Sequence, residues 1–382
     1  MITIPKFRTA SKQNIRTFAL PFENRTYTFK MQYEYDSWNR IQKMTYPDGE
    51  EVHYDYNLGG MLENVYGQYK RNNFDPYVPP IPHDSLIPLI PSNLNGQVSL
   101  NAFPGSHDPV PMYTTYTYPY IDSIAYNEFE LKSEVFYGNG THTRYDYDSI
   151  QRLRILQSQT RAGVDMQDIT YTYDAVGNIT GIVNTAGALP DGLGGTYSHH
   201  HEYDDLYRLA NSHGQWDNTE KNEHLMDTVR MTYHKNGRIA SKKSYANIYS
   251  EGGYGTTHTS QNSRRAYNYN TQQPNTLASV YDSVANTSQN FSWDNSGNMV
   301  AHNGRSLTWT EDNRLQTVTD NEWFSYYQYD VNGDRTYKLT GDYTYQNVSG
   351  TWRYFYQLDN ATLYASPYLV VYKFNLESYK SG

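Results

Sequence analysis

The 382-residue chain contains no cysteine, which excludes disulfide frameworks, thiolate nucleophiles and cysteine-ligated zinc sites. It has few aliphatic residues, because Leu, Val, Ile and Phe together make up 69 positions, about 18% of the chain. No apolar run approaches the roughly 18 residues of a membrane-spanning helix, and the N-terminal segment lacks the apolar core of a signal peptide. The formal net charge of −9 gives no indication of nucleic-acid binding.

Tyrosine is the abundant residue. It occurs 41 times, and aromatic residues make up 15% of the chain. Few aliphatic residues combined with a high net charge would indicate disorder, but nine charges are a small imbalance for this length. We therefore expect a folded chain that buries aromatic faces and forms strands, which tyrosine favours over helices.

An internal repeat explains where many of these aromatic residues occur. Its anchor is an aromatic residue followed by a short polar residue, and an aliphatic residue stands six positions after the anchor in eight of ten copies. The anchors are Tyr35, Tyr56, Tyr147, Tyr173, Tyr203, Tyr233, Tyr269, Trp293, Trp309 and Tyr329. The aspartates that follow an anchor directly are Asp36, Asp148, Asp174, Asp204, Asp294 and Asp330.

The spacing within each copy predicts a β-hairpin. A second aromatic residue stands two positions before the anchor in seven copies, which places both rings on one face of a strand. Gly or Asn stands four positions after the anchor in seven copies, and both tolerate the positive φ of a tight turn. The aspartate suits the same turn because its carboxylate accepts backbone N–H groups two residues on. Hairpins stacked side by side would bury their ring faces against one another.

These motifs resemble a known family. The segments YEYDSWNRIQKMTYPDGEEVHYDYN (33–57), YGNGTHTRYDYDSIQRL (137–153) and YTYDAVGNIT (171–180) resemble the tyrosine-aspartate (YD) repeats of rearrangement-hotspot (Rhs) proteins. Related repeats occur in insecticidal toxin-complex C subunits and in teneurins. The segment LDNATLYASPYLVV (358–371) resembles the end of the repeat region in Rhs-type proteins of Bacteroidetes.

The resemblance implies an all-β fold in which β-hairpins wind spirally into a hollow shell, and the short chain favours a partial or open shell. It also implies a partner, a C-terminal effector or toxin domain that lies outside this chain. The self-cleavage motif of such proteins is not found after the repeats. The family implies that the full-length protein is secreted or lies at the cell surface.

The chain divides into five predicted segments. A leading segment covers 1–26, repeats cover 27–68 and 120–340, and a closing segment covers 341–382. Residues 69–119 hold 10 of the 16 prolines, so we expect an extended insert there. The tracts 184–198 and 247–263 are rich in Gly, Ser, Thr and Asn, and we expect flexible loops.

The residues offer little evidence for catalysis, so we expect a structural module that is not an enzyme and has no metal or cofactor site. One aspartate per repeat fits a turn residue, whereas catalysis needs a single asymmetric constellation. The run His199–His201 could hold a metal, but no carboxylate stands at a recurring ligand spacing. The alternative function is cell-surface adhesion or carbohydrate binding, in which exposed aromatic faces bind a glycan or a surface protein.

Overall fold

A computed structural model describes residues 10–19, 26–72, 113–190, 192–252 and 255–374. In these ranges the chain forms strands and turns without a helix, so no helix there could cross a membrane. The strands are β1 (Ala10–Ala19), β2 (Thr26–Tyr35), β3 (Ile41–Thr45), β4 (Glu51–Tyr56), β5 (Leu62–Asn72), β6 (Tyr113–Tyr126), β7 (Lys132–Tyr137), β8 (His142–Tyr147), β9 (Leu153–Gln159), β10 (Asp165–Tyr173), β11 (Ile179–Asn184), β12 (Thr196–Tyr203), β13 (Leu209–Asn218), β14 (Glu223–Tyr233), β15 (Ile239–Gly252), β16 (Gly255–Tyr269), β17 (Leu277–Asp282), β18 (Thr287–Trp293), β19 (Met299–His302), β20 (Arg305–Trp309), β21 (Leu315–Thr319), β22 (Trp323–Tyr329), β23 (Arg335–Val348), β24 (Thr351–Ser366) and β25 (Leu369–Phe374).

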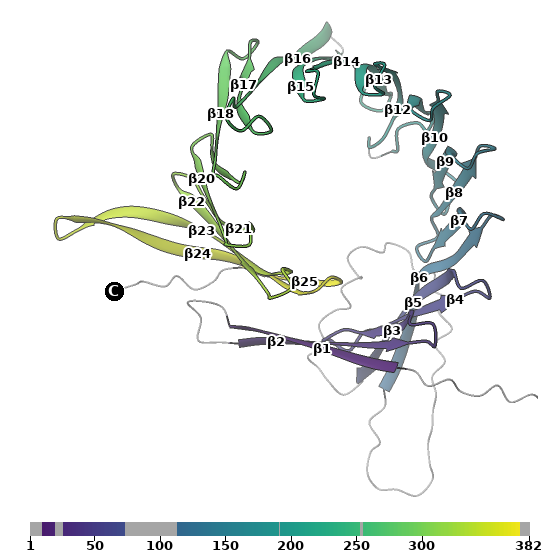
Figure 1. The fold of residues 1–382 in the computed structure, drawn as a ribbon. Helices are drawn as coiled ribbons and strands as arrows, with labels where there is room; N and C mark the ends of the chain where they lie inside the picture. The colour runs from purple at the N-terminus through teal and green to yellow at the C-terminus, as the bar shows by residue number, and fades with distance from the viewer. Residues whose placement is uncertain (1–9, 20–25, 73–112, 191, 253–254, 375–382) are drawn as a thin grey trace, which may run out of the picture. The chain divides into compact units, whose positions relative to one another are not determined.

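The chain forms two compact units. Unit 1 comprises Met1–Ile15, Lys30–His200 and Gln215–His224, and unit 2 comprises Arg16–Phe29, His201–Gly214 and Leu225–Gly382. The ladders from β2 to β12 and from β15 to β25 join strands that follow one another in the chain, and they are antiparallel (Figure 1). The repeat therefore forms a meander of hairpins, as its spacing predicted.

Unit 1 has a thin core in which a strand contributes about one buried side chain. Met44 on β3 pairs with Val52 on β4, and both side chains are buried. Ile124 on β6 and Val135 on β7 form a second buried pair. Because neighbouring strands supply the contacts, each hairpin depends mainly on the hairpins beside it.

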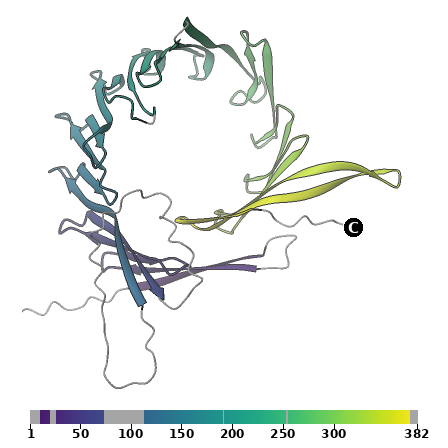
Figure 2. The same ribbon diagram turned by 180° about the vertical axis from the view of Figure 1, so that it is seen from behind.

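Unit 2 has a core cluster near the end of the repeats. Leu339, Leu358, Ala361, Leu363 and Ala365 are buried together, and Tyr27 and Phe29 of β2 pack against them. The strands that supply most of this cluster, β23 and β24, form a long hairpin that is visible in both views (Figures 1 and 2). The predicted closing segment thus contains a well-packed part of the unit.

The predicted leading segment also contributes to unit 2. Arg16 on β1 donates from one guanidinium nitrogen to the Tyr364 carbonyl and from another to the Asp330 carboxylate, both at 3.2 Å. These bonds join segments that lie more than 300 residues apart in the sequence.

The structure places both ends of the predicted insert (residues 69–119) inside strands. Residues 69–72 continue β5 and residues 113–119 begin β6, and these two strands pair with each other. Pro119 is accommodated in β6 next to a register shift between Val65 and Tyr66, where the regular ladder is interrupted. The remaining residues of the insert, 73–112, lie outside the described residues.

The prediction of a loop over 247–263 is wrong. These residues form most of the β15–β16 hairpin, whose ladder runs from the Ser241–Ala266 pair to the Gly252–Gly255 pair. Composition suggested a loop because Gly, Ser and Asn are common in turns. The pairing of two long strands supplies backbone hydrogen bonds that composition does not reveal.

The loop over 185–195 is held in place by buried amides. Asn184 is 4% exposed, accepts a hydrogen bond from the Asp168 backbone N–H at 2.8 Å and donates one to the Gly195 carbonyl at 3.0 Å. Asn218, also buried, donates to the Gly192 carbonyl at 2.9 Å. The expected flexible loop is therefore fastened at its base, and residues 196–198 belong to β12.

Candidate functional site

The aspartate after each anchor builds the turn. In the repeat of Tyr147, Asp148 Oδ1 accepts hydrogen bonds from the backbone N–H groups of Ile150 at 3.0 Å and Arg152 at 2.9 Å. Gln151, four residues after the anchor, has a φ of 67°, and the ladder shifts register beside Tyr147. This is a type I turn followed by a one-residue bulge. The carboxylates of Asp36, Asp174, Asp204, Asp294 and Asp330 accept the same pair of N–H groups.

The anchor side chain donates a hydrogen bond to the preceding repeat. The Tyr173 hydroxyl donates to the carbonyl of Leu153 at 2.6 Å, and Leu153 is the aliphatic residue six positions after the preceding anchor. The indole N–H of Trp309 donates in the same way to the Met299 carbonyl at 2.8 Å. The same donation is made by Tyr56, Tyr147, Tyr233, Tyr269, Trp293 and Tyr329.

These hydrogen bonds replace ladder bonds where neighbouring strands separate. The β9–β10 ladder ends at the Ile155–Thr170 pair, two residues before Leu153. Similarly, the β21–β22 ladder ends at Thr317–Tyr326, and Tyr329 then donates to the carbonyl of Leu315. The anchor thus caps a carbonyl beyond the ladder, which requires an O–H or N–H that phenylalanine does not carry.

An arginine five residues after the anchor links successive repeats, and the sequence reading did not identify it. Arg152 pairs with Asp148 of its own turn at 2.7 Å, and its guanidinium lies 4.4 Å from the centre of the Tyr173 ring in the next repeat. It also donates to the Asp174 carbonyl at 3.2 Å. The other arginines that lie over the next anchor ring are Arg40, Arg208, Arg238 and Arg314. The recurring Arg at this offset was the available signal.

The structure also contains a repeat that the sequence reading missed. Tyr126 donates to the Leu62 carbonyl at 2.7 Å, and Asn127 Oδ1 accepts the N–H groups of Phe129 and Leu131, both at 3.0 Å. Six positions after the anchor, where eight of the ten recognised copies have an aliphatic residue, this copy has Lys132. Lysine at this position still allows the link between repeats, because the backbone carbonyl of Lys132, and not its side chain, accepts the hydrogen bond from the next anchor, Tyr147.

The turn carboxylates of Asp204 and Asp294 are stabilised in their charged form. The Arg208 guanidinium, together with the backbone N–H groups of Arg208 and Leu206, lowers the pKa of Asp204. The side chain and backbone of Asn298 lower the pKa of Asp294. Burial raises the pKa of Tyr173, so its hydroxyl stays protonated as a donor. Each group is held in the protonation state that the turn or the cap requires.

The three consecutive histidines lie on β12. His199 pairs with Ile182 and His200 with Gly181 of β11, so the backbone of both belongs to the ladder. His200 is exposed, whereas His199 and His201 are half-buried on the opposite face. Among the described residues, no group of three His, Asp or Glu side chains is arranged to hold a metal.

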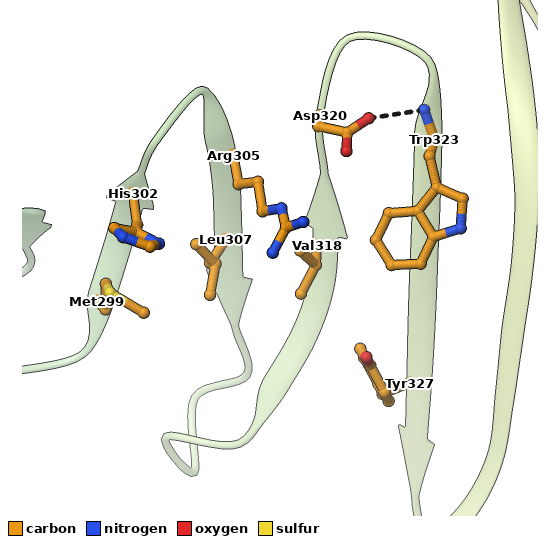
Figure 3. A pocket seen from close by; sticks show the side chains of 8 residues that line it. All are labelled: Met299, His302, Arg305, Leu307, Val318, Asp320, Trp323 and Tyr327. Carbon is orange, nitrogen blue, oxygen red and sulfur yellow. Dashed lines mark hydrogen bonds between the residues drawn. The ribbon is translucent and has the colours of Figure 1, made fainter. Parts of the chain in front are cut away.

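A shallow pocket of about 560 Å³ lies on one face of β19–β22 in unit 2. Its lining residues are Met299, His302, Arg305, Leu307, Val318, Asp320, Trp323 and Tyr327 (Figure 3). Met299, Leu307 and Val318 supply apolar surface, and two aromatic rings come from β22. Backbone N–H groups of Glu322 and Trp323 lower the pKa of Asp320. The pocket therefore combines apolar and aromatic surface with one cation and one carboxylate.

Comparison with solved structures supports the fold. The TcdB2-TccC3-TEV crystal structure matches 95% of this chain with a TM-score of 0.62 and 16% identity, over 16% of its own length. TcdB2-TccC3 without its hypervariable C-terminal region matches 92% of this chain with a TM-score of 0.58 and 16% identity, over 16% of its length. The Photorhabdus luminescens Tc holotoxin pore matches 88% with a TM-score of 0.57 and 16% identity, over 15% of its length.

This chain thus spans about one sixth of the toxin-complex structures that it matches. No family model matches the sequence, and no curated protein does. The predicted fold class, an all-β chain of wound β-hairpin repeats, is confirmed by the strands and by this shared fold.

Proposed function

We propose that this chain is part of the YD-repeat shell of an Rhs-type polymorphic toxin or surface protein, and that it sequesters or presents a C-terminal effector. The observation that carries the proposal is the link between repeats, in which at least eight of the ten anchors cap a carbonyl of the preceding hairpin. This link allows a shell to be extended by adding further repeats, because each added hairpin is hydrogen-bonded to the hairpin before it. The role is structural and needs no catalytic group.

The toxin-complex structures support the second half of the proposal. One of them is described as lacking a hypervariable C-terminal region, so a relative in fold carries a variable segment of that kind. A wall that accepts variable cargo must hold it without a site specific to one sequence. The recurring side chains described above bind the repeats to one another, so the shell forms without a site specific to one cargo.

The experiment expresses the natural gene beyond codon 382 in bacteria, with and without the segment that encodes this chain. We expect a variable C-terminal domain that inhibits growth when expressed alone and resists protease only when joined to the repeats. A reading frame that ends here, or a downstream domain that is digested equally fast in both forms, contradicts the proposal. Tyr173→Phe, which removes one hydrogen bond between repeats, should speed digestion, whereas the matched control Tyr171→Phe should not.

The pocket on β19–β22 favours a second candidate function, carbohydrate binding. Trp323 and Tyr327 offer rings on which a sugar can stack, and Arg305 and Asp320 offer polar groups beside them. Titration of glycans into the chain should then give saturable binding that Trp323→Ala abolishes and Tyr281→Ala, at an exposed ring outside the pocket, retains. Equal binding by both variants contradicts this candidate.

A further inference from the structure

The hairpin turns of unit 1 carry exposed apolar residues at their tips. The residue three positions after the anchor is Trp38, Phe129, Ile150 or Val176, and these side chains are 56–65% exposed. In the repeat of Tyr56 the apolar residue is Leu58, two positions after the anchor, and it is fully exposed. We call these five residues the tip row.

The tip row lies along one edge of the sheet. The anchor strands β2, β4, β6, β8 and β10 are every second strand of an antiparallel meander, so they run in the same direction and end at the same edge. Strands in a sheet lie about 4.8 Å apart, which spaces the tips by about 10 Å. The row is therefore a regular apolar stripe rather than a set of scattered residues.

The turn itself does not require these apolar residues. In unit 2 the same position, three after the anchor, holds Asn236, Ser296, Asp312 and Asn332, and these turns form as well. In the turn of Tyr203, also in unit 2, this position holds the exposed Leu206, and Val331 stands two positions after Tyr329. Four turns in unit 1 thus expose large hydrophobic side chains at a position where polar residues form the same turn, and the turn of Tyr56 exposes Leu58 one position earlier.

The opposite edge of unit 1 is different. Its turns contain Pro47-Asp48-Gly49, Gly138-Asn139-Gly140 and Arg161-Ala162-Gly163, which are polar or small. The opposite edge also exposes Val164 (49%) and Leu193 (61%), so the two edges differ in degree, and the anchor edge carries more large apolar side chains. Large exposed apolar patches on a folded protein mark interaction surfaces.

We propose that the tip row binds the tip row of a second copy of this chain. A complementary surface must present apolar groups with a spacing of about 10 Å, and an identical row has that spacing over its whole length. Two such rows related by a two-fold axis meet as one self-complementary contact. The row exposes on the order of 500 Å² of apolar surface, so two copies bury about 1,000 Å².

That area is at the lower limit of specific interfaces, so the dimer is weak and depends on concentration. Sedimentation velocity of the purified chain between about 1 and 200 µM should show a reversible shift from monomer to dimer with micromolar affinity. The triple variant Phe129→Ser/Ile150→Ser/Val176→Ser should remain monomeric over the same range. The double variant Val164→Ser/Val284→Ser should dimerise like the unchanged chain, because Val164 lies at a turn of the opposite edge of unit 1 and Val284 at a turn of unit 2, each with 49% exposure.

Two results overturn the proposal. One is a monomer at every concentration. The other is equal dimerisation of the triple variant and the unchanged chain. The β-sheet circular dichroism and urea midpoint of each variant establish that it is folded. Because the assay uses neither effector nor glycan, its outcome is independent of the proposed functions.

Discussion

The anchor hydroxyl offers the most direct test of how the repeats hold together. We predict that Tyr173→Phe, which removes a single oxygen atom, destabilises unit 1 measurably. The Tyr173 hydroxyl donates to the Leu153 carbonyl at 2.6 Å, two residues beyond the end of the β9–β10 ladder. Phenylalanine keeps the ring in place beneath the Arg152 guanidinium, so the change isolates the hydrogen bond.

The magnitude follows from the environment of this bond. A hydrogen bond contributes about 1 kcal/mol net, and a shielded carbonyl left without a donor costs about 1–3 kcal/mol. Tyr173 is half-buried, so water reaches the carbonyl in part, and we expect a loss of about 1–2 kcal/mol. With a urea dependence of about 3 kcal/mol per molar, the unfolding midpoint falls by about 0.5 M.

Urea unfolding followed by circular dichroism measures this loss, and Tyr171→Phe is the control. Tyr171 lies on the same strand and face, two residues before the anchor, and no hydrogen bond of its hydroxyl is seen within the described residues. Its loss should stay below about 0.5 kcal/mol. Tyr329→Phe in unit 2 should behave like Tyr173→Phe, because its hydroxyl caps the Leu315 carbonyl at 2.9 Å.

If the unfolding midpoints of Tyr173→Phe and Tyr171→Phe both equal that of the unchanged chain, the reasoning is wrong. The anchors would then act through ring packing alone, and the hydroxyl would exchange its bond for one to water without cost. A loss in both variants would instead show that the two hydroxyls matter equally, which the geometry does not predict.

Three further predictions concern the other interactions. Arg40→Lys should lower the free energy of unfolding in urea by about 1–2 kcal/mol, because lysine cannot both pair with Asp36 and cover the Tyr56 ring. The control Arg154→Lys, at an exposed ion pair, should change it by less than about 0.5 kcal/mol. Asn184→Ala should cost about 2–3 kcal/mol and speed proteolysis of the loop after β11, whereas Asn211→Ala, at an exposed amide, should not. Burial raises the pKa of Tyr173, so its contribution to the free energy of unfolding is fully present below about pH 10 and is lost as the pH rises further. The turn lowers the pKa of Asp204. The stability from the aspartate is complete above about pH 4 and lost as pH falls further; a flat urea midpoint from pH 2 to 12 would contradict both assignments.

The sequence predicted the repeat because its signals are local. The aspartate, the residue with positive φ and the paired aromatic residues all act within one hairpin, so their spacing is visible along the chain. Gly177 has a φ of 98° at the predicted turn position, and Asp174 accepts the predicted backbone bonds. The repeat of Tyr126 was missed because its side chains depart from the pattern at Ile124, Glu130 and Lys132, whereas the interaction with the next repeat uses the carbonyl of Lys132.

Features that join different parts of the chain could not be predicted in this way. The long β15–β16 hairpin has the composition of a loop, and only strand pairing distinguishes the two. The contact of Arg16 with Asp330 joins residues 314 positions apart, and no local pattern marks it. The tip row is likewise a property of the sheet, because the tips become neighbours only when the anchor strands align.

By itself, the sequence determined that this protein is a stack of β-hairpins, because turn chemistry and strand alternation are encoded within about a dozen residues. It also indicated that tyrosine serves the architecture, which we attributed to packing. Only the tertiary structure decided why the anchor is tyrosine or tryptophan rather than phenylalanine. Where successive hairpins separate, a backbone carbonyl needs a donor, and the anchor of the next hairpin provides it.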